Sequence, residues 1–118
     1  MVIKVVLVAA LAIACHLLFG WMWTCLAAVL GGSFAEKRGW LIGLSGLIFG
    51  WGTIVIFQFI QAPRQVSEMA RVVGALAGGL PAAGTYVLTL LVAALIGATG
   101  GAVGAAVRPF FKKESRLA

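Results

Sequence analysis

The sequence predicts an all-α integral membrane protein: three transmembrane helices, with a short interfacial amphipathic helix before the third. Three stretches carry no Asp, Glu, Lys or Arg: Val5 to Leu30, Trp40 to Gln61 and Ala82 to Val107. At about 1.5 Å of rise per residue, each can cross a hydrocarbon layer of roughly 30 Å. Only 10% of the 118 residues are charged. Soluble domains use about 25%, so lipid is the expected solvent of these helices.

The first predicted helix covers residues 2–30 and ends at Gly31 and Gly32, because paired glycines favour a turn. A lysine followed by apolar residues also occurs in signal peptides. Here the apolar residues continue past any small-residue cleavage site, so we expect an uncleaved anchor. The stretch is longer than one crossing needs. Either the helix tilts, or Trp21 and Trp23 mark the interface and the following residues run along the membrane surface.

The second predicted helix covers residues 40–61 and ends before Pro63, which cannot continue a helix. Residues 64–79 then combine an apolar face with an opposite polar stripe at helical spacing, which is typical of a short helix lying in the membrane interface. The apolar face consists of Val66, Met69, Val73, Leu76 and Leu80, and the stripe of Arg64, Glu68 and Arg71. Two alternatives stay open: one long third helix broken at residues 78–81, and a fourth full span.

The third predicted helix covers residues 82–107 and ends at Arg108 and Pro109. The tail, residues 108–118, is aromatic and basic. Such a composition suits lipid headgroups. The residues expected to bind anionic headgroups are Arg108, Lys112, Lys113 and Arg116.

The distribution of basic residues predicts an orientation. Three crossings place Lys4, Arg64 and Arg71 on one side and all other Lys and Arg on the opposite side. The positive-inside rule then predicts the N-terminus outside and the C-terminus in the cytoplasm, and we expect the bacterial cytoplasmic membrane. Because the basic residues adjoin apolar segments and form no polar face, they indicate anionic lipids as partners and not nucleic acid.

Two rows of small residues are the strongest pattern within the predicted spans. Spacings of three and four keep each row on one helix face, where missing side chains let another backbone approach closely. The predicted packing residues are Gly39, Gly43, Gly46 and Gly50 in the second helix, and Gly97, Gly101 and Gly104 in the third. The contacted helix can belong to the same chain or to another subunit. We expect at least one row to contact another subunit or a flat cofactor.

His16 is the only histidine and lies near the middle of the first apolar stretch. An imidazole in hydrocarbon needs a partner, so His16 is the candidate cofactor-binding residue, with a tetrapyrrole (pigment or haem) as the possible ligand. The alternative is a neutral histidine hydrogen-bonded to a neighbouring helix. We expect no metal site, because Cys25 lies on nearly the opposite helix face and no second histidine exists.

The chemistry that is missing also limits the function. The carboxylates Glu36, Glu68 and Glu114 are all expected outside the hydrocarbon, so no buried acid can carry protons. The sequence has no phosphate-binding loop, no nucleophile beside a base and no carboxylate pair for acid–base work. We therefore expect no enzyme, and no soluble substrate is evident.

Three functions stay open on this evidence. The leading hypothesis is a small accessory subunit that packs through its glycine faces against larger membrane proteins or copies of itself. The second is a homo-oligomeric channel or small transporter whose path is lined by Thr85, Thr89 and Gln58. The third is a pigment- or haem-binding subunit that uses His16.

Overall fold

The computed structural model describes residues 1–35 and 37–117, and these residues form helices without any strand. Three helices are long and apolar enough to cross a membrane: α1 (Val2–Phe19), α3 (Gly39–Gln61) and α5 (Ala82–Leu117). The shorter elements are the 3-10 turn η1 (Trp21–Trp23), α2 (Thr24–Ser33) and α4 (Pro63–Leu76). The all-α fold class with three candidate spans is confirmed. Glu36, one of the three carboxylates, lies outside the described residues.

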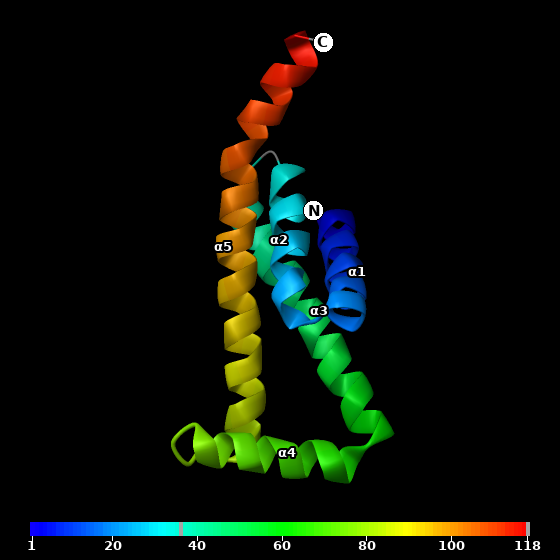
Figure 1. The fold of residues 1–118 in the computed structure, drawn as a ribbon, viewed down its shortest axis with the longest axis vertical. Coiled ribbons are helices and arrows are strands. Elements are labelled where there is room, and N and C mark those ends of the chain that lie inside the picture. Colours follow the sequence, from blue (N-terminus) through cyan, green and yellow to red (C-terminus); the bar gives the residue numbers. More distant parts are fainter. Residues whose placement is uncertain (36, 118) are drawn as a thin grey trace.

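The single first helix over residues 2–30 is wrong. α1 ends at Phe19, and Gly20 adopts φ 102° and ψ 171°, a conformation that is essentially restricted to glycine. The chain reverses through η1, and α2 returns beside α1 as a helical hairpin (Figure 1). The ammonium of Lys4 donates to the backbone carbonyl of Phe34 at 3.2 Å, which ties the start of α1 to the end of α2.

Because of this hairpin, both ends of the chain lie toward the same end of the bundle and not at opposite ends. The guanidinium of Arg108 donates to the backbone carbonyl of Ala35 at 2.9 Å, next to the carbonyl that Lys4 contacts. The N-terminus and the C-terminal part of α5 therefore lie at the same end of the bundle (Figure 1). The sequence led us to expect the two termini at opposite ends of the helices, but because the first apolar stretch runs out and back they lie at the same end.

The third helix does not end at Arg108 and Pro109, as the sequence predicted. α5 continues through Pro109 to Leu117. Proline removes one backbone N–H and crowds the carbonyl four residues earlier, which bends a helix. The final turns of α5, orange to red in Figure 1, tilt away from the axis of the preceding turns and extend beyond the rest of the bundle.

The stretch predicted as an amphipathic helix over residues 64–79 forms α4, which ends at Leu76. Gly78 and Gly79 follow with φ values of 108° and 87°, and they turn the chain into α5. A continuous third helix is therefore not formed, and with 14 residues α4 is too short for a fourth span. α4 lies across the ends of α3 and α5 (Figure 1), where the hydroxyl of Thr85 donates to the carbonyl of Ala70 at 2.9 Å.

Candidate functional site

Half of the bundle is held together by direct backbone contacts between α3 and α5. A Cβ added at Gly43 would overlap the carbonyl oxygen of Gly97, and one added at Gly97 would lie 2.8 Å from the Cα of Leu44. A Cβ at Gly39 would lie 2.9 Å from the carbonyl oxygen of Gly101. We call residues 39–50 of α3 and 97–104 of α5, with the α2 and α1 segments that cover them, the closed half.

The remaining glycines of both rows face the helical hairpin. A Cβ at Gly104 would lie 2.8 Å from the backbone nitrogen of Ser33 in α2. A Cβ at Gly46 would lie 2.7 Å from the Cβ of Val8 in α1, and Gly50 faces Ala9. Both predicted rows are thus covered by helices of the same chain. Neither is open to another subunit or to a flat cofactor in this structure.

The other half of the bundle contains a cavity. Toward α4, the helices α3 and α5 diverge, and α4 spans the gap between their ends (Figure 1). We call residues 51–61 of α3, 82–92 of α5 and α4 the open half. Its cavity has a volume of about 580 Å³ and is lined by side chains from the hairpin, α3, α4 and α5: His16, Trp21, Trp51, Ile54, Val55, Gln58, Val73, Thr85, Leu88, Thr89 and Val92.

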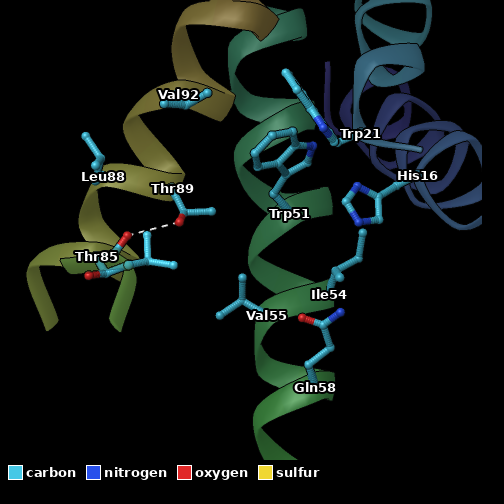
Figure 2. A pocket seen from close by; sticks show the side chains of 11 residues that line it. His16, Trp21, Trp51, Ile54, Val55, Gln58, Thr85, Leu88, Thr89 and Val92 are labelled. Atoms are coloured by element: carbon cyan, nitrogen blue, oxygen red, sulfur yellow. Dashed lines mark hydrogen bonds between the residues drawn. The ribbon is translucent and has the colours of Figure 1, made fainter. Parts of the chain in front are cut away.

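His16 and Trp51 meet at the end of this cavity nearest the closed half (Figure 2). Their ring centroids are 5.9 Å apart with the planes at 67°, which is an edge-to-face contact. Trp51 is only 8% exposed. Within the described chain, Nδ1 of His16 and Nε1 of Trp51 are buried without a hydrogen-bond partner. Native structures rarely leave buried polar atoms unpaired, so these two nitrogens require an explanation.

The three polar residues predicted to line a path all line this cavity: Thr85, Thr89 and Gln58. Two of them already donate to the chain's own backbone, Thr85 to Ala70 and Thr89 to Thr85 at 3.0 Å. The backbone contact between Gly43 and Gly97 closes the space between α3 and α5 beyond the cavity. A path through one copy of the chain therefore ends in the middle of the bundle.

Sequence reasoning missed Trp51 and assigned Trp21 to the membrane interface. A tryptophan near the middle of a span, and not at its end, was the available signal, since Trp normally collects where the membrane meets water. Its meeting with His16 was hidden, because the straight helix predicted for residues 2–30 gave no indication of where the histidine lies relative to α3.

The basic residues predicted to bind headgroups lie at the far end of the closed half. Lys112, Lys113 and Arg116 are exposed, whereas Arg108 is partly covered and donates to Ala35. In residues 1–35 and 37–117, no group of three His, Cys, Asp or Glu side chains could hold a metal ion. Comparisons with protein families, curated proteins and solved structures give no match.

Proposed function

We propose that this protein is a small, non-catalytic accessory subunit of a larger membrane complex, and that its partner covers the tip of the α1–α2 hairpin, residues 18–23. The ring contact between His16 and Trp51 sets the tip opposite the middle of α3. Large apolar side chains at the tip point away from the rest of the chain: Leu18, Phe19 and Met22 are 74%, 66% and 70% exposed.

The backbone at the tip supports a protein partner more strongly than the side chains do. Where a helix ends, its last carbonyls and the first N–H groups of the next helix lose their helical partners. Lipid tails offer no replacement, so non-helical backbone at membrane depth persists only where protein or a water-filled cavity adjoins it. The reversal at Gly20 is such a site. Helices of the same chain already cover both glycine rows, so these rows cannot contact a partner. We therefore propose the hairpin tip as the contact surface.

The arrangement also leads to a proposal for the membrane position. The chain carries nine Lys and Arg. With the hairpin, only Arg64 and Arg71 belong to the α4 end, and all the others belong to the end that holds both termini. By the positive-inside rule we propose that both termini lie in the cytoplasm of a bacterial cell, with the exposed basic residues at anionic headgroups. α4 lies in the opposite interface with Arg64, Glu68 and Arg71 in water.

Site-specific photocrosslinking in cells tests the accessory role. A benzophenone amino acid at Met22 is expected to form an adduct with one defined membrane protein, which also copurifies with the unmodified chain in mild detergent. Leu95 on α5 is the matched control, because it is exposed to a similar degree, 67% against 70%, but lies away from the tip. Equal adducts at both positions, or lipid adducts alone together with a monomeric chain, would contradict the proposal.

A further inference from the structure

We infer that the cavity of the open half binds a neutral molecule dissolved in the membrane, made of a carbonyl-bearing ring of the quinone type and a hydrocarbon tail. The inference does not rest on the partner proposed for the hairpin tip, although Trp21 in η1 lies both at the tip and in the cavity lining. Its volume of about 580 Å³ falls within the range of about 300–1,000 Å³ that is usual for small-molecule sites.

The unpaired indole nitrogen of Trp51 defines the polar atom of the ligand. An indole N–H can only donate a hydrogen bond, so the missing partner is an acceptor. Leaving a buried donor unpaired costs about 1–3 kcal/mol, and a carbonyl oxygen would remove that cost. Figure 2 shows the nitrogen-bearing edge of the Trp51 ring turned toward His16, whose Nδ1 is also unpaired. Both nitrogens are covered by neighbouring side chains in this structure, so a ligand carbonyl reaches Nε1 of Trp51 only when the His16 ring turns aside. The turned His16 can then supply a second contact to the same ligand ring.

The rest of the lining defines the charge and shape of the ligand. No lining residue is a Lys, Arg, Asp or Glu, so a charged group would lack a counter-ion in hydrocarbon. A tetrapyrrole with carboxylate side chains therefore fits less well than a neutral molecule. His16, Trp21 and Trp51 provide aromatic rings at one end, where a planar ring can stack. Val55, Leu88 and Val92 provide an aliphatic surface for the tail.

The position of Trp51 along α3 argues against an ordinary phospholipid as the ligand. α3 has 23 residues and is about 34 Å long, which matches the hydrocarbon thickness. Trp51 lies near its middle, whereas the ester carbonyls of phospholipids lie in the polar interface. A carbonyl that reaches Trp51 must therefore belong to a molecule whose ring enters the hydrocarbon.

Equilibrium binding of tritiated decylubiquinone to the full chain in nanodiscs tests this inference. The nanodiscs are made from ether-linked phospholipids, so that the probe carries the only ligand carbonyls, and empty nanodiscs give the background. We expect saturable binding, competition by unlabelled probe, and no competition by decylbenzene, which has the tail and a ring but no carbonyl. Repeating the measurement in ester-linked lipid is expected to change little.

Variants assign the binding to the cavity. Trp51→Phe keeps an aromatic ring but removes the N–H, and we expect affinity to fall about three- to tenfold, as for loss of one hydrogen bond. Trp40→Phe is the matched control, because Trp40 lies at the other end of α3 and does not line the cavity. Leu88→Trp, which fills the cavity, is expected to abolish binding while the thermal unfolding midpoint stays close to that of the parent.

Four results would overturn the inference. The first is the absence of saturable binding, and the second is that decylbenzene competes as well as the unlabelled quinone. The third is that Trp51→Phe and Trp40→Phe lower the affinity equally. The fourth is that the quinone no longer binds in ester-linked lipid, which would identify phospholipid as the occupant. None of them bears on crosslinking at Met22, so the accessory role and the ligand site can fail separately.

Discussion

The closed half and the open half are built from the same two helices, yet they pack in opposite ways. In the closed half, glycines bring the backbones of α3 and α5 into contact, as at Gly43 and Gly97. In the open half, Trp51 of α3 and Thr85 of α5 line a cavity instead of bringing the two backbones together. Along the same pair of helices, glycines thus coincide with direct backbone contact and larger side chains with a cavity.

This difference has an energetic consequence. Lipid tails are as apolar as the helices, so burial alone does not drive helices together, and close van der Waals contact becomes the main attraction. The closed half has many such contacts. The open half depends on a few fixed points, among them the hydrogen bond from Thr85 to Ala70. We therefore expect substitutions in the two halves to differ sharply in their effect on stability.

The largest effect is expected from adding a side chain in the closed half. Gly43→Leu would force α3 away from the carbonyl of Gly97 and should lower the free energy of unfolding by about 3 kcal/mol or more, as severe overpacking does. Thr89→Leu adds bulk beside the cavity and should cost less than about 1 kcal/mol. Unfolding in mixed micelles with rising SDS, followed by circular dichroism, measures both. Equal losses would show that the two halves do not differ in packing.

Gly20→Ala is expected to have the next largest effect, through the backbone alone. A Cβ at Gly20 would meet nothing within 4 Å, but φ 102° strains any other residue by about 1–3 kcal/mol. The matched control is Gly52→Ala, where the added Cβ lies 3.9 Å from Cδ2 of Leu90.

The same variant tests the hairpin itself. A cysteine placed at Val2, in a chain with Cys15 and Cys25 changed to Ala, reports the side of the N-terminus through labelling with an impermeant maleimide. The parent should label on the same side as the C-terminus. If Gly20→Ala straightens α1 and α2 into one helix, part of the population should label on the opposite side. A parent labelled opposite its C-terminus would contradict the hairpin.

The sequence was sufficient for the all-α class and for three helices long and apolar enough to cross a membrane, because both follow from composition and length. It was not sufficient for the hairpin. The residues on either side of Gly20 are apolar, so hydropathy does not distinguish one long crossing from a helix that turns back. The reversal becomes visible only in the structure, in the φ of Gly20 and in the contact of Lys4 with Phe34. The continuation of α5 through Pro109 was missed for a related reason: proline weakens a helix locally, but the bent helix continues to Leu117.

The candidate site was predictable only in parts. His16, Thr85, Thr89 and Gln58 were each identified from their polarity within apolar segments, but as members of two separate hypotheses. They line one cavity because the hairpin brings His16 to Trp51, and that meeting depends on contacts between residues far apart in the chain.

Thr85→Val should have a smaller effect, confined to the open half. Valine keeps the shape of threonine but cannot donate to Ala70, so α4 should detach more readily, at a cost of about 1 kcal/mol. Hydrogen–deuterium exchange is expected to rise in residues 63–76 and to stay unchanged in α3. Thr99→Val is the control, because the hydroxyl of Thr99 bonds only within its own helix. Faster exchange throughout the closed half would show that the two halves are not independent.

The smallest effect is expected at the ion pair on α4. Arg71 donates to Glu68 at 2.6 Å, but the two side chains are 66% and 69% exposed, and pairs of this kind contribute little in water. Glu68→Gln should therefore change the free energy of unfolding by less than about 0.5 kcal/mol at any ionic strength. A loss of 2 kcal/mol or more would mean that hydrocarbon and not water surrounds the pair. α4 would then lie deeper than the interface, and the open half would be enclosed by the membrane on every side.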